Sequence, residues 1–485
     1  MNYRMTLYVI GLISLTVAGL MLIPFVMSLA YGETGTPLAF GVTLIALLLV
    51  GIPNLVKKPK NRSLSARGGF LIVSLAWIYL SLMGALPFCI SRSIPNYIDA
   101  LFETISGFTT TGASILKDIE ALPKSILFWR SFTHWIGGMG VLLFVIAVLP
   151  KSDPSIVHLI KAETPGPQFG KLVSKLRFSA QITYAIYIAI TLLEVIALAC
   201  CGCNAYDSFL HAFATAGTGG FSSYGNSIAS MNNLAVEIVI TVFMMIFSVN
   251  FNLFYLIIIG HIKDVIRSEE LRVLLSVFVI STLAISVSLT VNHVYSFAQA
   301  LRYSSFQTAA MISTTGFSTA DFTTWPAFTQ VILFLLMFMG GSAGSTAGGL
   351  KVSRFIIATK SSFRKLKTSI SSRSYSPIKL DGRPVNDALV TGVNSYLAMF
   401  FLLLGISAML VSIASPKGFG AIENISAVVT CINNVGPGLG ALGPSGNFSP
   451  YNAFAKIVLC FDMLLGRLEV IPILLLFYPK SWVRN

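Results

Sequence analysis

The chain has 485 residues, of which 55% are hydrophobic and only 11% are charged, and its formal net charge is +14. Soluble domains carry about 25% charged residues, so this composition excludes an ordinary soluble protein. Ten apolar runs have the length of roughly 20 residues that crosses a hydrocarbon core. They do not alternate as the strands of a membrane β-barrel do, which predicts an all-α polytopic membrane protein. The runs cover residues 5–30, 37–56, 68–90, 127–149, 180–203, 234–260, 271–291, 327–350, 388–414 and 453–478.

The first run has two interpretations. Ser28–Leu29–Ala30 precedes Tyr31 in the manner of a secretory cleavage site. The apolar core of a signal peptide is only about 7–15 residues long, however. Because this run is longer, we expect a retained membrane helix.

Basic residues gather in alternate gaps between the runs. They lie in residues 57–67, 151–177, 263–272 and 351–383, whereas several acidic residues lie in the other gaps. Lysine and arginine concentrate on the cytoplasmic side of membrane proteins. This placement predicts that both termini are cytoplasmic, and it accounts for the positive charge without a nucleic-acid partner.

Four short motifs end in glycine, each between two apolar runs. They read TTTG, GTGG, STTG and NNVG, end at Gly112, Gly220, Gly316 and Gly436, and recur at roughly a hundred residues, as in a repeat architecture. A segment too short to span the membrane precedes each motif. These four segments cover residues 99–107, 206–216, 302–312 and 421–432.

The motifs suit a ring of cation ligands. Glycine tolerates a positive φ, which lets a peptide carbonyl turn toward a central axis. Carbonyl oxygens from four such loops can replace the hydration shell of a cation, and the motifs contain no lysine or arginine, which disfavours an anion pore. The predicted filter residues are Thr109, Thr110, Thr111, Gly112, Thr218, Gly219, Gly220, Ser313, Thr314, Thr315, Gly316, Asn433, Asn434, Val435 and Gly436.

The repeats divide the chain into five parts. Residues 1–67 form a two-helix extension, and residues 68–150 and 151–262 form pore repeats 1 and 2. Residues 263–385 form repeat 3 with the basic cytoplasmic segment, and residues 386–485 form repeat 4.

The motifs SGFTTTGAS, GTGGFS, STTGFS and NNVGPGLG resemble the filter loops of the Trk/Ktr/HKT superfamily of potassium transporters. The two extra N-terminal helices and the C-terminal GRLEVIPILLLF are similar to the TrkH family within it. The resemblance implies uptake of K⁺ across the bacterial inner membrane, with K⁺ as the bound substrate ion. It also implies a homodimer regulated by a cytosolic TrkA-like ring that binds NAD and ATP, whereas this chain has no nucleotide motif.

Two features suggest a gate below the filter. Glycine and other small residues from Gly340 to Gly349 interrupt the eighth run, and each glycine costs about 1 kcal/mol of helix stability relative to alanine. Arg467 lies within an apolar run, where a charge is costly and usually functional. The alternatives are small-residue helix packing and a salt bridge from Arg467 to a neighbouring helix. The predicted gate residues are Gly340, Gly341, Gly344, Gly348, Gly349 and Arg467.

Other polar residues within the runs and near the motifs are assigned to packing or to the pore mouth. We expect Arg130 and His134 to be interfacial or packing residues, and Glu194, Asn250 and Asn252 to contact other helices. The cysteines are expected to serve as small apolar packing residues. The acidic residues near the motifs are expected to form a solvated rim, with concentration of cations at the pore mouth as the alternative; they are Asp99, Glu103, Asp207 and Glu423.

A gated pore selective for K⁺ and Rb⁺ over Na⁺ is the function that the sequence favours. A proton- or sodium-coupled potassium symporter is the alternative, which would use broken helices and carboxylates near the middle of the membrane. The apolar runs contain no HExxH, GxSxG or paired-aspartate motif, so an enzyme is disfavoured.

Overall fold

The computed structural model describes residues 2–57, 59, 66–140, 176–371 and 377–482. The end of the run 127–149 and the boundary between repeats 1 and 2 lie outside the described residues. So do several residues used in the charge argument, namely Lys58, Lys60, Arg62, Lys151, Lys161, Lys171, Lys175 and Arg373.

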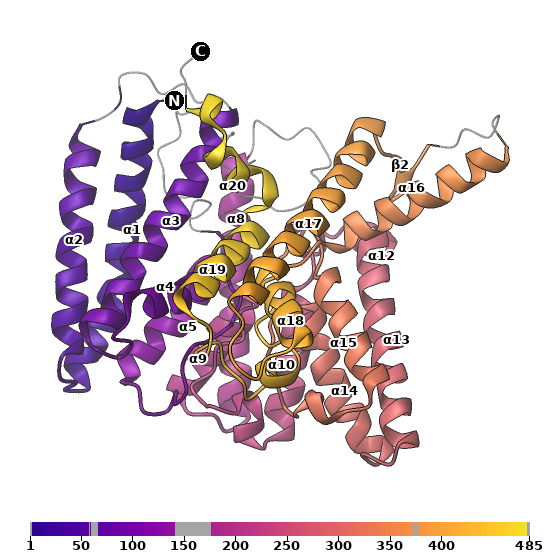
Figure 1. Cartoon of the computed structure of the whole chain (residues 1–485), viewed down its shortest axis with the longest axis horizontal. Coiled ribbons are helices and arrows are strands. Elements are labelled where there is room, and N and C mark those ends of the chain that lie inside the picture. Colours follow the sequence, from indigo (N-terminus) through magenta and orange to yellow (C-terminus); the bar gives the residue numbers. More distant parts are fainter. Residues whose placement is uncertain (1, 58, 60–65, 141–175, 372–376, 483–485) are drawn as a thin grey trace.

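The predicted N-terminal extension is a helical hairpin. Helix α1 (Tyr3–Ala30) and helix α2 (Thr36–Val56) lie side by side at the left of Figure 1, and α1 also packs against the first pore repeat. Asn2 caps α1 by accepting a hydrogen bond from the Met5 amide at 3.2 Å. Gly35, with φ of 87°, turns the chain into α2, where a proline occupies the first turn.

Each of the four repeats contains an outer helix, a short pore helix and an inner helix, which confirms the predicted fold class. The outer helices are α3 (Ala66–Ile90), α8 (Leu176–Cys200), α13 (Glu269–Val291) and α17 (Asp387–Ile413). The pore helices are α4 (Tyr97–Phe108), α9 (Ala205–Ala216), α14 (Phe297–Ile312) and α18 (Ala421–Ile432). The inner helices are α5 (Lys124–Gly138), α10 (Leu234–Phe247), α15 (Ala327–Met339) and α19 (Ala453–Leu468).

The ten apolar runs do not become ten continuous helices. Six described helices are long and apolar enough to cross a membrane, or seven if the bent pair of α10 and α11 (Phe251–Ile258) is one span. That pair bends by 92°. Helix α15 ends before Gly340, and α19 ends before Glu469, beyond which α20 (Val470–Phe477) begins. Breaks of this kind persist in a membrane only where protein groups bond the freed backbone.

The remaining elements lie mostly in the connections. Helix α12 (Ile262–Arg267) precedes α13, and the basic segment after repeat 3 forms helix α16 (Val352–Ile370) and a hairpin of β1 (Lys379–Leu380) and β2 (Arg383–Pro384). The two strands are antiparallel, with Leu380 opposite Arg383. Short 3₁₀ helices are η1 (Ser227–Met231), η2 (Phe322–Thr324), η3 (Gly440–Leu442) and η4 (Pro479–Ser481).

The repeats are arranged as a closed ring. The inner helix of each repeat packs against the pore helix of the next, in the pairs α5–α9, α10–α14, α15–α18 and α19–α4. The last pair joins repeat 4 to repeat 1. A pseudo-four-fold bundle follows, in which every pore helix lies between its own repeat and a neighbour.

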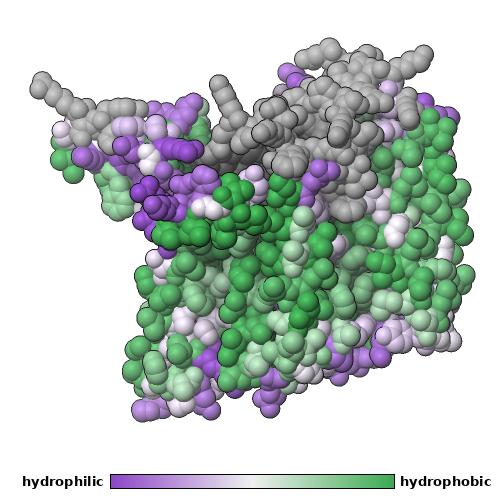
Figure 2. Space-filling view, turned by 180° about the vertical axis from the view of Figure 1, so that it is seen from behind, coloured by the Kyte–Doolittle hydropathy of each residue, from purple (hydrophilic) through white to green (hydrophobic). Residues whose placement is uncertain are grey.

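The surface has the pattern of a membrane protein. A broad apolar band lies between hydrophilic rims in Figure 2, and exposed side chains such as Ile45, Ile280 and Leu402 contribute to the apolar surface. The start of α1 and the η4 turn lie at the same end of the molecule as α16, whereas α9, α14 and α18 lie toward the other end (Figure 1). The predicted grouping of the basic segment with both ends of the chain therefore agrees with the fold.

Candidate ion pore

The four glycine motifs adopt the same backbone conformation. The second residue of each motif has a positive φ, at 57° for Thr110, 55° for Thr218, 57° for Thr314 and 54° for Asn434. The glycine that ends each motif is also left-handed, with φ of 79°, 77°, 74° and 107° in chain order. Positive φ is uncommon for residues other than glycine, so a shared strained conformation marks these four segments as equivalent. Residues 109–112, 217–220, 313–316 and 433–436 are called the candidate filter below.

The four segments touch one another in cyclic order. A methyl group added to Gly112 would lie 2.0 Å from the Gly219 carbonyl oxygen. A methyl group added to Gly220 or to Gly316 would lie 2.0 Å from the carbonyl oxygen of Thr315 or Val435, respectively. At Gly436 the added carbon would lie 2.8 Å from the Thr111 carbonyl oxygen. The third carbonyl of each motif thus packs against the glycine of the neighbouring motif, and the ring closes from repeat 4 to repeat 1.

The pore helices aim their C-terminal ends at this ring. Each ends directly before its motif, and Asn96 and Asn204 cap the opposite ends of α4 and α9 by accepting backbone N–H bonds at 2.8 Å. The C-terminal end of a helix carries partial negative charge. The four helices therefore favour a cation at the ring.

Outward from the ring lies a polar cavity of about 100 Å³. Its lining includes all four motif glycines together with Arg130 and Lys117. The glycines therefore form the outer end of the candidate filter, and the segment after each glycine forms the wall of this vestibule.

The sequence differences between the motifs are compensated by packing. In repeats 1 and 3 hydroxyl pairs brace the loop, with 2.8 Å between the Oγ1 atoms of Thr109 and Thr111 and 2.7 Å between Ser313 Oγ and Thr315 Oγ1. In repeat 4 the Asn434 amide donates to Thr111 Oγ1 at 3.0 Å and to the Met463 carbonyl at 2.9 Å.

Repeat 2 is braced from outside its own loop. The His134 ring fills the space beside Gly219, where an added methyl group would lie 2.4 Å from the imidazole. The ring also lies against Phe221, with 4.1 Å between centroids, and Nδ1 is 2.7 Å from the Gly107 carbonyl oxygen. The irregular motifs thus reach the same conformation by different contacts.

The small-residue segment of repeat 3 is a non-helical intramembrane loop at residues 340–351. It begins at Gly340, with φ of 66°, and ends where α16 starts. Its amides reach the inner end of the candidate filter, because Gly348 N donates to Thr314 Oγ1 at 2.6 Å and Gly349 N donates to the Asn433 carbonyl at 2.9 Å. Gly341 and Gly344 lie against the bend between α10 and α11, at Ser248 and Asn250. The loop therefore connects the filter segments of repeats 3 and 4 to the break between α10 and α11 in repeat 2.

The buried carboxylate of Glu270 anchors this loop and the start of α16. Glu270 on α13 accepts hydrogen bonds from the amides of Ala343, at 2.7 Å, and Ser353, at 3.2 Å. Lys351 is buried and donates to the Ala347 carbonyl. The loop is thus satisfied by side chains, as irregular backbone within a membrane must be.

Arg467 joins the loop to two inner helices. From α19 its guanidinium donates to the Thr346 carbonyl at 2.8 Å, to the Gly137 carbonyl at 2.6 Å and to the Gly138 carbonyl. These acceptors lie on the loop and at the C-terminal end of α5. Asp462, on the same helix, accepts a hydrogen bond from Ser407 at 2.7 Å. Glu469 forms an ion pair with Arg354 at 2.6 Å.

The predicted acidic rim is wrong for two of its four residues, Glu103 and Asp207. Glu103 is buried beneath the vestibule and pairs with Arg130. Arg130 and His134 are buried, which fits the packing alternative and not the interfacial one. Asp207 is also buried, and its carboxylate accepts from the hydroxyls of Ser223 and Tyr224, each at 2.8 Å. The carboxylates of Glu103 and Asp207 therefore hold loops in place through hydrogen bonds and an ion pair and do not face water.

The other weakly predicted residues have structural partners. Asp99 pairs with Lys456 at 2.6 Å, and Glu423 caps α18 at Gly420 N. Asn250 caps α11 by accepting from Asn252 N. Cys431 and Cys460 are buried as expected for packing, whereas Cys200 is exposed at the end of α8.

The described residues contain no group of three or more His, Cys, Asp or Glu side chains that could hold a metal ion. The candidate filter instead offers carbonyl and hydroxyl oxygens, the ligand type that alkali cations accept.

Comparison with known proteins agrees with this geometry. A family model described as "TrkH: Cation transport protein" matches residues 39–484. The chain belongs to the TrkH family. The family is one of transport proteins rather than enzymes, and its model spans all four repeats of this chain.

Individual relatives cover the chain almost completely. The Trk system potassium uptake protein TrkH of Escherichia coli K12 is 35% identical over 491 residues, which cover 99% of this chain and 100% of the relative. The Trk system potassium uptake protein TrkG of the same strain is 34% identical, and 95% of each chain is covered. The crystal structure of the potassium transporter TrkH from Vibrio parahaemolyticus matches with a TM-score of 0.89 at 31% identity, covering 100% of both chains.

Proposed function

We propose that this chain takes up K⁺ through a channel-like pore whose selectivity filter is the ring of residues 109–112, 217–220, 313–316 and 433–436. The observation that carries the proposal is the closed cyclic contact between the four motifs, each with the same two left-handed residues. The relatives named as potassium uptake proteins support K⁺ as the transported ion. Rb⁺ should follow K⁺, while Na⁺ is disfavoured because a smaller ion makes poorer contacts with a ring of this kind.

We further propose that the loop at residues 340–351 and Arg467 form the gate on the cytoplasmic side of the filter. The loop contacts the inner end of filter segments 3 and 4, and Arg467 joins the loop to α5. In this proposal a cytosolic TrkA-like nucleotide-binding ring controls the loop through α16, which begins directly after it. We also propose that the protein is a homodimer in the bacterial inner membrane and that both of its termini are cytoplasmic.

Flux in proteoliposomes tests the proposal. The purified protein should carry K⁺ and Rb⁺ at similar rates and Na⁺ and Li⁺ several-fold more slowly, with the direction of current set by the K⁺ gradient. Addition of the nucleotide-loaded cytosolic partner should change the rate without changing this order. Equal Na⁺ and K⁺ permeability would contradict the proposed filter.

A coupled symporter is the second candidate, because two carboxyl groups lie buried in the helical bundle. Glu194 on α8 and Asp462 on α19 are both fully buried, and one Asp462 oxygen has no hydrogen-bond partner. A proton-coupled mechanism requires such groups to exchange protons. It predicts that a pH gradient alone drives K⁺ uptake and that Asp462→Asn or Glu194→Gln abolishes this drive. The pore predicts no uptake from a pH gradient in the wild-type protein.

Replacement of Arg467 by alanine should raise K⁺ conductance several-fold. The change removes a positive charge near the ion path and releases the bonds to Thr346, Gly137 and Gly138. Conductance is measured in planar bilayers, with Arg364→Ala as the matched control, because Arg364 forms an ion pair with Asp387 outside residues 340–351. Loss of folded protein without a rise in conductance would favour a purely structural bond.

A further inference from the structure

We propose that Glu103 and Arg130 are positioning residues that set the discrimination between K⁺ and Na⁺, by holding together the chain segments that leave filter motifs 1 and 2. This inference rests on the proposed function of the filter. The ion pair joins pore helix α4 to inner helix α5, with 2.7 Å between Arg130 Nε and Glu103 Oε1 and side-chain exposures of only 2% and 0%. A buried ion pair stabilises a protein only when further hydrogen bonds satisfy both groups, so the partners of this pair are informative.

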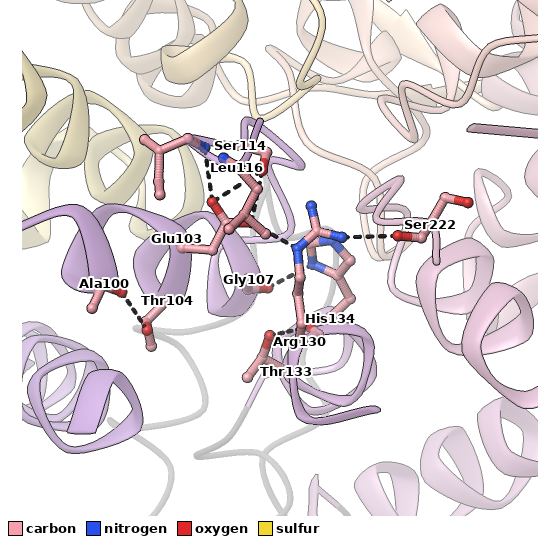
Figure 3. A network of polar contacts seen from close by, with 11 residues as sticks. Ala100, Glu103, Thr104, Gly107, Ser114, Leu116, Arg130, Thr133, His134 and Ser222 are labelled. Carbon is pink, nitrogen blue, oxygen red and sulfur yellow. Dashed lines mark hydrogen bonds and ion pairs between the residues drawn. The ribbon is translucent and has the colours of Figure 1, made fainter. Parts of the chain in front are cut away.

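The remaining partners of Glu103 all belong to the segment after motif 1. Its carboxylate accepts from Ser114 Oγ at 2.9 Å and from Ile115 N at 2.9 Å, two and three residues beyond Gly112. Figure 3 shows Glu103 between this segment and Arg130. One side chain therefore holds the wall of the vestibule against the pore helix that ends at the filter.

Arg130 extends the same brace into the second repeat. Its Nη1 donates to the Ser222 carbonyl at 3.0 Å, and its guanidinium lies 3.5 Å from the centre of the Phe221 ring. Both residues directly follow Gly220. Figure 3 shows Arg130 reaching from α5 toward Ser222 on one side and Glu103 on the other. The fixed fork of the guanidinium suits such a three-part bridge, whereas lysine has a single flexible ammonium.

In the other repeats a pore-helix side chain also bonds to the segment after the motif glycine, through uncharged contacts. Glu103 lies six residues before motif 1, and His211, Gln307 and Ala427 occupy this position before motifs 2, 3 and 4. His211 Nε2 lies 2.9 Å from Ser222 Oγ, and Gln307 Nε2 donates to the Ala320 carbonyl at 3.4 Å. In repeat 4 the preceding residue acts instead, because Ser426 Oγ accepts from Leu439 N at 3.1 Å. Tethering is therefore common to all repeats, and in repeat 1 it is charged and reaches into its neighbour.

The position of Arg130 relates this brace to ion selection. Arg130 lines the outer cavity together with the four motif glycines. Selectivity depends on the number and spacing of the oxygens that replace the hydration shell. Movement of the segments at Ser114 and Ser222 would shift Gly112 and Gly220, which each contact a neighbouring carbonyl. Loss of Glu103 would also leave an unpaired positive charge at the mouth.

A second ion pair provides a matched control. Arg302 on pore helix α14 and Glu237 on inner helix α10 are joined by two hydrogen bonds of 2.7 and 2.6 Å. The pair has the same residue types and joins the same kinds of helix, yet neither residue lines the outer cavity. It therefore tests what the loss of an ion pair between a pore helix and an inner helix does on its own.

The test compares Arg130→Lys and Glu103→Gln with Arg302→Lys and Glu237→Gln in the full-length protein, reconstituted in proteoliposomes. Reversal potentials with K⁺ and Na⁺ give the permeability ratio, and thermal unfolding in detergent confirms folding. The several-fold preference for K⁺ should fall to a permeability ratio near one in the Arg130 and Glu103 variants, a change no larger than the roughly tenfold effect of losing one charge-assisted hydrogen bond. The control variants should keep the wild-type ratio even where their stability falls.

A milder variant covers the case in which Glu103→Gln does not fold. Ser114→Ala removes only the hydroxyl that donates to Glu103 and should lower the ratio in the same direction by a smaller factor. An unchanged ratio in folded Arg130→Lys and Ser114→Ala would overturn the inference. Wild-type protein that does not prefer K⁺ would overturn the proposed filter instead, so the two failures are distinguishable.

Discussion

Replacement of Gly220 or Gly316 by alanine should abolish most K⁺ flux and remove the preference for K⁺ over Na⁺. The added methyl group would lie 2.0 Å from a carbonyl oxygen of the next motif, and both glycines have left-handed φ values of 77° and 74°. The strained backbone alone costs on the order of 1–3 kcal/mol for a residue other than glycine. The neighbouring carbonyl must move as well, so the ring loses its geometry. Flux and reversal potentials in proteoliposomes measure both effects.

The structure also predicts an order among the four glycines. At Gly436 the added carbon would lie 2.8 Å from its nearest neighbour, the Thr111 carbonyl oxygen, rather than 2.0 Å. Gly436→Ala should therefore impair flux less than Gly112→Ala. Gly392→Ala on α17 is the matched control, because the added carbon would meet no atom within 4 Å beyond the neighbouring backbone of its own helix. Equal flux in Gly220→Ala and Gly392→Ala would contradict the ring.

Deletion of residues 342–346 should raise K⁺ flux severalfold in the absence of the cytosolic partner. The deletion removes the Thr346 carbonyl that accepts from Arg467 and the contact between Ser342 N and the Ser248 carbonyl at 2.8 Å. It keeps Gly348 and Gly349, whose amides bond to filter segments 3 and 4. The inner end of the filter should therefore stay intact while the obstruction beneath it shortens. Ion flux in proteoliposomes is the measurement.

A Glu270→Gln variant distinguishes an effect on gating from a general disruption of the structure. Glu270→Gln weakens the anchor at Ala343 and Ser353 without shortening the loop. It should raise flux less than the deletion does, and it should leave the K⁺ to Na⁺ ratio unchanged. Unchanged or lower flux in the folded deletion variant would count against a gate at residues 340–351.

Most of the fold could be predicted from local sequence. Burial of an apolar run in hydrocarbon depends on its own composition, so the outer helices α3, α8, α13 and α17 follow from hydropathy. The four motifs were detectable because glycine recurs at one place in each repeat. The breaks in α10 and α19 were not predicted, since Ser248 and Glu469 leave the apolar character of their runs largely intact.

The left-handed residues before the glycines also left no clear signal. Thr110, Thr218, Thr314 and Asn434 adopt this conformation where the pore helices end, and each amide donates to a carbonyl three residues earlier in its own repeat. Glycine is the usual residue at such a left-handed helix end, so threonine and asparagine gave no signal of it. The role of Glu103 was misjudged for a different reason. An acidic residue near a predicted pore mouth has the same local sequence whether it faces water or a buried arginine.

The sequence by itself determined the membrane class, the four repeats and the positions of the four motif glycines, because transfer free energy and glycine conformation are properties of short segments. Only the tertiary structure decided that the motifs close into a ring, that Arg467 bonds to backbone carbonyls and that Arg130 bridges two repeats. These contacts join residues far apart in the chain, as between Gly436 and Thr111 or Arg467 and Gly137. Their geometry depends on how whole helices pack, which no local pattern of residues specifies.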